Sequence, residues 1–264
     1  MLENLLVVMR SVILLILISL NISREFPLDD YIYLDDLDSS LHDDIIFEDY
    51  KEDLYQDSEK KVQIRSVIKD PVYRWKDGII YYYIDEVFTT IQRAHIIQQM
   101  EEIANVTCLQ FKPKTKTSSD YVHIMGRSNG CHSQVGRRGG RQVLNLKPSA
   151  LNTGCFRKGV VKHEMMHTIG FYHEHNAPDR DDYITINWEN IQDDKISNFD
   201  KQLPEMVTNF SIPYDYDSMS HYGRRIFSKN GLHTITPRDP NAIIGQRDRL
   251  SDADIYKIKL MYNC

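Results

Sequence analysis

Cysteine is scarce in this chain of 264 residues, which contains only Cys108, Cys131, Cys155 and Cys264. No two of them are spaced as a CxxC pair, and this argues against the structural zinc sites that are built from such pairs. Their even number instead fits two disulfides, for which three pairings are open.

An excess of basic charge is also missing. The chain has 32 Lys and Arg residues against 38 Asp and Glu residues, so its net charge is -6 and its pI is near 5.9. Nucleic-acid-binding proteins usually carry a basic domain or stripe, so we expect no nucleic-acid partner. The length allows one substantial core and a short extra segment, but not a multidomain receptor.

Long apolar runs are missing apart from one near the N-terminus, where residues 12–18 are all apolar and follow Arg10. A membrane span needs about 20 apolar residues without a central charge, and Arg10 interrupts this stretch. We therefore predict a signal peptide over residues 1–23 and a secreted, extracellular protein, in preference to an uncleaved membrane anchor.

Residues 24–65 are strongly acidic, with 14 Asp and Glu against 5 Lys and Arg. Such a composition favours a disordered, solvated tail when it stands alone. The other interpretation is an acidic propeptide that docks on a body formed by residues 66–264. The motifs of that body decide between the two.

Local patterns in the body predict both strands and helices. A strand rich in β-branched and aromatic residues, Ile79–Ile84, follows an Asp-Gly turn. A helix should come next, capped by a threonine and carrying apolar residues at helical spacing. These residues are Thr89, Thr90, Ile91, Ala94, Ile97 and Ile103. The other expected strands are Cys108–Phe111, Tyr121–Met125 and Val143–Leu146, and the other expected helices run from about Phe156 to Gly170 and from Asp252 to Tyr262.

Two histidines, His163 and His167, stand four residues apart with Glu164 between them. On a helix, side chains at this spacing lie on one face about one turn apart, close enough to bind one metal ion. Glu164 can then reach a water on that ion. Because HExxH also arises by chance in structural helices, the pattern needs further support.

Gly170 and His173 supply that support. Glycine at position 170 allows the positive φ that ends a helix and turns the chain, so that His173 returns toward the metal. Three imidazoles leave a fourth position open, which is typical of catalytic zinc. We predict one Zn²⁺ per chain held by His163, His167 and His173, with Glu164 as general base toward a zinc-bound water in peptide hydrolysis. Histidines that are merely satisfied in a core are the alternative.

The residues from His163 to His173 fit HExxHxxGxxH, the pattern of the metzincins. Their continuation to Tyr183 closely resembles the astacin family of zinc endopeptidases, as do Tyr73-Arg74-Trp75 and the segment from Tyr214 to Gly223. The resemblance extends over residues 66–264. It implies an enzyme that cuts internal bonds of protein or peptide substrates and is secreted as a zymogen.

The resemblance also implies a fold. This is an α+β, two-lobed metzincin catalytic domain with zinc at the base of a cleft. The N-terminal lobe would contain a twisted, mainly antiparallel-edged sheet and two long helices, and the C-terminal lobe irregular chain and a short closing helix. The implied disulfides are Cys108–Cys264 and Cys131–Cys155. Tyr222 would be a displaceable zinc ligand that stabilises the developing oxyanion, and a buried aromatic side chain is the alternative.

Activation is expected to follow a cut by a trypsin-like protease after Arg65. By resemblance, the new amino group at Ser66 would pair through water with Glu174, whereas a local salt bridge of Glu174 is the alternative. Asp49 is our candidate for a zinc-blocking ligand in the propeptide, although the glycine of the family's Phe-x-Gly-Asp motif is missing here. The resemblance places Tyr121–Met125 and the chain beyond Gly130 at the cleft rim, where a peptide can add as a strand.

The Met-turn departs from the family pattern, in which methionine immediately precedes the His-Tyr pair. Here Ser220 precedes His221 and Tyr222, and Met219 comes one residue earlier. Because that methionine forms an apolar floor beneath the metal, we expect altered stability or zinc retention before loss of activity. A catalytically weakened homologue that acts as a binding protein or toxin component is the alternative function. Glu174 and the segment 218–222 disfavour a matrix-type metzincin.

Overall fold

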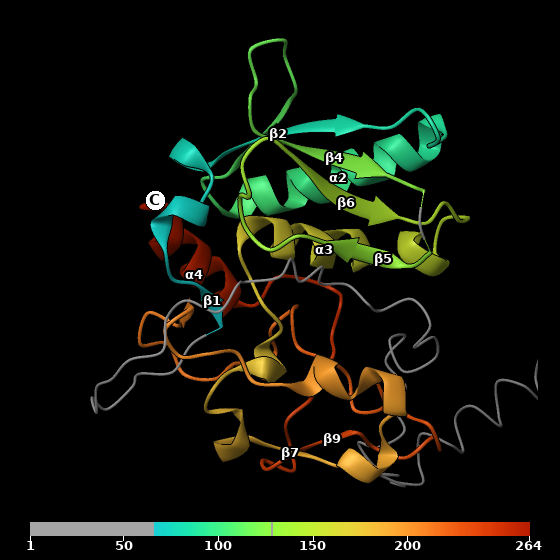
Figure 1. Ribbon diagram of the computed structural model, residues 1–264, viewed down its shortest axis with the longest axis vertical. Coiled ribbons are helices and arrows are strands. Elements are labelled where there is room, and N and C mark those ends of the chain that lie inside the picture. The colour runs from blue at the N-terminus through green and yellow to red at the C-terminus, as the bar shows by residue number, and fades with distance from the viewer. Residues whose placement is uncertain (1–65, 128) are drawn as a thin grey trace, which may run out of the picture. The chain divides into compact units, whose positions relative to one another are not determined.

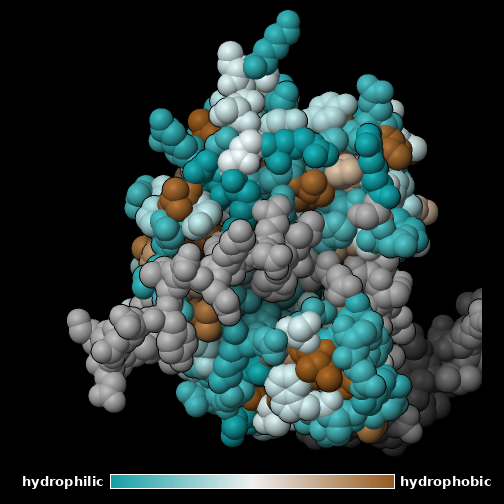
Figure 2. Space-filling view, in the orientation of Figure 1, coloured by the Kyte–Doolittle hydropathy of each residue, from teal (hydrophilic) through white to brown (hydrophobic). Residues whose placement is uncertain are grey.

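The computed structural model describes residues 66–127 and 129–264. The predicted signal peptide, the predicted propeptide and Asp49 lie outside the described residues. Within the described part of the chain, no helix is long and apolar enough to cross a membrane. On the face drawn in Figure 2, hydrophilic residues cover most of the described surface and the apolar side chains form small separate patches.

A five-stranded sheet forms the upper part of the body in Figure 1, with the strand order β3-β2-β4-β6-β5. Its strands are β2 (Ile79–Ile84), β3 (Gln110–Pro113), β4 (Tyr121–Met125), β5 (Cys131–Ser133) and β6 (Arg141–Leu146). All pairings are parallel except that of β5 with β6, so the antiparallel pairing is confined to one edge. The sequence placed β3 two residues too early and did not predict β5.

Helix α2 (Thr90–Val106) begins as expected, because Thr89 and Gln92 form a reciprocal capping box. Its predicted apolar face is wrong in part. Ile91 is 65% exposed, whereas Ile96, Met100 and Ile103 are buried in the core. Both sets recur at helical spacing, so periodicity alone does not select the face that packs on the sheet.

Helix α3 (Val160–Ile169) packs against α2, β5 and β6. The predicted start near Phe156 is wrong, because Phe156 lies in a separate 3-10 turn. Gly159 caps the helix with a φ of 77°, and a Cβ atom there would lie 1.8 Å from the carbonyl oxygen of Arg247. The helix therefore begins where the backbone passes too close to another segment for any side chain.

Beyond Gly170 the chain is mostly irregular, as the resemblance implied. Three short strands lie in this region. Strand β8 (Val207–Thr208) pairs antiparallel with β1 (Val67–Ile68) from the start of the body, and β7 (Ile184–Ile186) pairs antiparallel with β9 (Ile235–Pro237). The described residues contain seven 3-10 helices. Three precede Gly170, namely Pro71–Tyr73, Lys76–Gly78 and Gly154–Phe156, and four follow it, namely Glu174–Asn176, Arg180–Asp182, Trp188–Asn190 and Asp193–Phe199. Helix α4 (Asp252–Tyr262) has the predicted bounds and is capped by Ser251.

Two hydrophobic clusters stabilise the body. One joins the sheet with α2, α3 and α4, and the other surrounds Phe199, Tyr222 and Phe227. The disulfides Cys108–Cys264 and Cys131–Cys155 are both formed, as the resemblance implied. The first ties the end of α4 to the segment before β3, and the second ties β5 to the turn before α3.

Candidate metal centre and active site

Helix α3 carries His163, Glu164 and His167, and every residue of this helix is buried. The helix ends at Gly170, whose φ is 126° and whose amide donates to the carbonyl oxygens of Met166 and His167. A Cβ atom at Gly170 would lie 2.8 Å from a methyl carbon of Ile68. The predicted glycine turn is thus confirmed.

The turn at Gly170 brings His173 beside the two helical histidines. One ligand atom of each of the three residues lies within 4.8 Å of the others. The rings of His163 and His173 are nearly parallel, with centroids 5.4 Å apart, and the ring of His167 is nearly perpendicular to both. All three predicted ligands therefore converge on one point.

Backbone carbonyls fix the orientation of the two helical imidazoles. Nδ1 of His163 lies 2.9 Å from the oxygen of Met219, and Nδ1 of His167 lies 2.8 Å from that of Phe171. A carbonyl oxygen only accepts hydrogen bonds, so each Nδ1 carries a proton and each Nε2 presents a lone pair. Such outer-shell hydrogen bonds are typical of metal-binding histidines.

The spacing of these lone pairs fits zinc. The two Nε2 atoms are 3.2 Å apart, a distance at which two lone pairs repel each other unless a cation binds both. Tetrahedral zinc with Zn–N bonds of about 2.0–2.1 Å holds its nitrogens about 3.3 Å apart. Both the donor set and its spacing therefore match a zinc site.

Tyr222 lies beside this cluster and is 2% exposed. Its ring centroid is 4.2 Å from that of His173, and on the other side it stacks on His175 at 4.0 Å. Phe199 and Phe227 contact it edge-on. Tyr222 is thus a buried aromatic side chain, which was the alternative, and it also lies beside the three-histidine cluster.

The Met-turn is polar where the family pattern is apolar. The Ser220 hydroxyl lies 2.9 Å from that of Ser218, which donates to Asp254 at 2.8 Å. Asp254 also accepts from the amide of Met219, whose carbonyl orients His163. Met219 is fully buried in the cluster that contains α3. The methionine packs one residue earlier than in the family pattern, and a hydrogen-bond network replaces it at Ser220.

Glu174 forms a local ion pair, which was the alternative to our expectation. Both of its carboxylate oxygens accept from Lys257 of α4, at 3.0 and 3.2 Å, and Lys257 is fully buried. The lysine also donates to the Ser66 hydroxyl at 2.9 Å. No motif marked Lys257, because it lies 83 residues from Glu174 in the sequence.

Burial shifts several pKa values around the site. Burial lowers the pKa of His221 to about 4 and that of His175 well below its ordinary value, so both rings stay neutral. Burial and then the neighbouring Asp254 raise the pKa of Asp215 to about 6. The structure buries His175 between the rings of Tyr222 and His221.

One of the two segments expected to accept a peptide as an added strand is wrong. Strand β4 (Tyr121–Met125) pairs with β2 on one side and β6 on the other, so it has no edge to which a peptide could add. Among the described strands, β5 pairs with β6 alone and forms the edge next to α3 (Figure 1). Strand β5, in the chain beyond Gly130, is therefore an edge strand to which an extended peptide could add.

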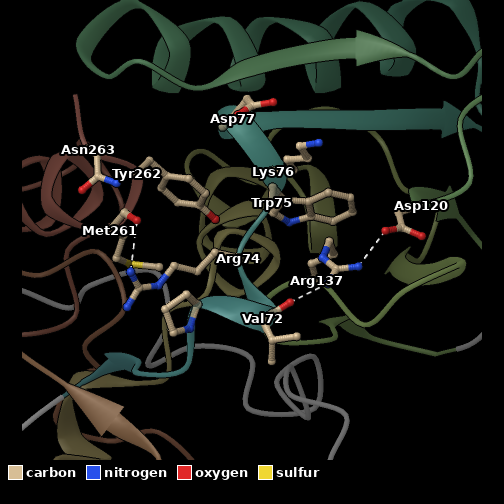
Figure 3. Close-up of a pocket in the computed structure, with 12 residues that line it drawn as sticks. Val72, Arg74, Trp75, Lys76, Asp77, Asp120, Arg137, Met261, Tyr262 and Asn263 are labelled. Atoms are coloured by element: carbon tan, nitrogen blue, oxygen red, sulfur yellow. Dashed lines mark hydrogen bonds and ion pairs between the residues drawn. The ribbon is translucent and has the colours of Figure 1, made fainter.

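A cavity of about 600 Å³ lies away from the histidines, on the side of α3 that faces Trp75 and Tyr262 (Figure 3). The indole of Trp75 donates to the oxygen of Thr168, and the hydroxyl of Tyr262 donates to that of Ile169. Arg137 in its wall forms an ion pair with Asp120 at 2.7 Å. Two of its lining residues thus bond to the end of α3, and none of the predicted site residues lines it.

Comparisons with known proteins agree with this site. Residues 67–263 match the family model Astacin, which describes a peptidase family. Zinc metalloproteinase nas-13 of Caenorhabditis elegans is 40% identical over 200 residues, which are 76% of this chain and 43% of that protein. Low choriolytic enzyme of Oryzias latipes is 39% identical over 197 residues, which are 72% and 69% of the two chains.

A solved structure shares the fold. High choriolytic enzyme 1, a hatching enzyme zinc-protease from Oryzias latipes, superposes with a TM-score of 0.66 and 37% identity, over 72% of this chain and 93% of that one. Several curated relatives are longer, and the match spans only 43% of nas-13. With the family match over 67–263, the three-histidine cluster and both disulfides in place, the chain belongs to the astacin family.

Proposed function

We propose that this protein is a zinc-dependent endopeptidase in which His163, His167 and His173 hold the metal. The observation that carries the proposal is the 3.2 Å approach of two deprotonated Nε2 atoms beside a third imidazole. When bound, zinc would act as a Lewis acid toward the carbonyl of the bond to be cut and would lower the pKa of water.

The chain's own residues supply the remaining chemistry. Glu164 follows His163 directly and is fully buried, so its carboxylate takes the proton of the attacking water and returns it to the leaving nitrogen. Tyr222, next to His173, donates a hydrogen bond to the substrate oxygen as negative charge develops there. The buried surroundings strengthen both interactions because bulk water does not screen them.

The substrate is an extended polypeptide that pairs with the edge strand β5. Main-chain hydrogen bonds to a sheet edge suit many sequences, which fits an endopeptidase of broad choice. The protein is secreted and made as a zymogen, released by a cut after Arg65. The signal-like pattern at residues 1–23 supports secretion, as does the similarity to hatching enzymes.

The test is zinc content and cleavage of a generic protein substrate by the full chain, before and after light trypsin treatment. A matched control replaces His163 and His167 with alanine. We expect one zinc per chain, cleavage only after trypsin, inhibition by a chelator, and neither zinc nor cleavage in the control.

Bound zinc without cleavage in any form would contradict the proposal. It would favour the catalytically weakened homologue instead.

A further inference from the structure

Glu174 stands directly after the third zinc ligand and ties that segment to two others. Its amide donates to the carbonyl oxygen of Ser220, and its carboxylate accepts from the amide of Asp215 at 3.1 Å. Glu174 is 2% exposed. Whatever holds this carboxylate therefore also holds the backbone that presents His173.

Lys257 holds it. The lysine has three N–H donors and three acceptors in range, the two oxygens of Glu174 and the hydroxyl of Ser66. Lysine and glutamate are both buried, and a buried ion pair with all its hydrogen bonds made is costly to break from one side. The positive charge that balances Glu174 thus comes from Lys257 of helix α4.

Backbone hydrogen bonds hold Ser66 beside the ion pair of Lys257 and Glu174. The Ser66 amide donates to Thr208, and its carbonyl accepts from the amide of Tyr172. Strand β1 follows at once and pairs with β8. Ser66 occupies this position in a chain in which it is joined to Arg65, and its amide nitrogen is not charged there.

Two further carboxyl groups face Lys257 from its surroundings, and neutral donors satisfy them. Asp254 accepts from the hydroxyl of Ser218 and from the amides of Met219 and Ser251, and Asp215 accepts from the hydroxyl of Ser251. Their hydrogen bonds are complete without a second cation.

We propose that Lys257, and not an amino group released at Ser66, is the positioning residue that holds Glu174 and the His173 segment. On this proposal, cleavage after Arg65 is not needed to supply Glu174 with a counter-charge. This inference rests on the proposed function and replaces the expectation of a water-mediated pair between Ser66 and Glu174.

The test compares two amino termini on the full chain with Lys257 unchanged. Trypsin acting after Arg65 leaves Ser66 first. In Arg65→Gln, the next tryptic sites upstream are Lys60 and Lys61, so the product keeps a few residues before Ser66. Mass spectrometry identifies each terminus, and zinc content is matched.

We expect the form that begins at Ser66 and the extended form to have kcat values within about twofold of each other. Their melting temperatures without zinc should differ by no more than about 1 °C. A kcat lower by about tenfold or more in the extended form, or a melting temperature lower by several degrees, overturns the proposal. In that case the amino group performs the role that we assign to Lys257.

A second arm changes the lysine. Lys257→Gln should lower kcat and the melting temperature of the extended form, and Lys257→Arg, which keeps the charge, should recover both. Unchanged values in Lys257→Gln overturn the proposal. If no form cleaves peptides, the proposed function fails, but the melting temperatures of the zinc-free forms still decide where the counter-charge lies.

Discussion

Replacing Ser220 with methionine restores the residue order typical of the family, yet we expect it to destabilise this protein. Ser220 is fully buried, and its hydroxyl and amide both bond to the Ser218 hydroxyl. A larger side chain forced into a packed site costs about 1–3 kcal/mol, and the lost hydroxyl contact costs about 1 kcal/mol more. The expected fall in melting temperature is roughly 5–15 °C.

The assay is thermal unfolding of the zinc-free protein, which separates packing from metal affinity. Ser220→Ala is the matched control and should cost only about 1 kcal/mol, because it removes the hydroxyl without adding volume. Adding Met219→Val to Ser220→Met should recover part of the loss, because it vacates buried space. An unchanged or higher melting temperature for Ser220→Met would refute the reasoning. It would mean that Met219 does not already occupy the buried space beneath the three histidines.

Three further changes probe other parts of the account. Gly170→Ala should lower the free energy of unfolding by several kcal/mol in denaturant titrations, because φ is 126° and the new methyl meets β1 and α4. His221 is neutral in the folded protein with a pKa of about 4 against 6.5 when unfolded. Its contribution is therefore full above pH 6.5 and falls by up to about 3 kcal/mol as the pH drops toward 4, so unfolding of His221→Asn should be less pH-dependent over that range. Replacing Cys108 and Cys264 with alanine should cost about 2–5 kcal/mol in the same titrations, and an unchanged stability would contradict the importance of that disulfide.

The sequence predicted best those features that depend on a few consecutive residues. Helix α4 matched its predicted bounds because Ser251 supplies a cap and the helical period is clear. The metal cluster was predicted because two ligands lie on one helix and Gly170 allows the turn to the third. In both cases the chemistry of the segment itself determines its conformation.

Features that depend on distant segments were not predictable. Helix α3 starts late because Gly159 passes close to Arg247, and this approach is a tertiary contact. The central position of β4 results from pairing on both sides, which its own residues do not encode. Lys257 gave no signal, because a single lysine in an amphipathic helix usually faces solvent.

The most direct test of the central claim is the zinc content and turnover of Glu164→Gln, in the trypsin-treated form, against wild type. Glutamine keeps the size of the buried side chain and leaves the three histidines intact, but it cannot take a proton. We predict one zinc per chain and a turnover lower by a factor of about 10²–10⁴. Turnover within tenfold of wild type at full zinc content would contradict the role of Glu164 as general base.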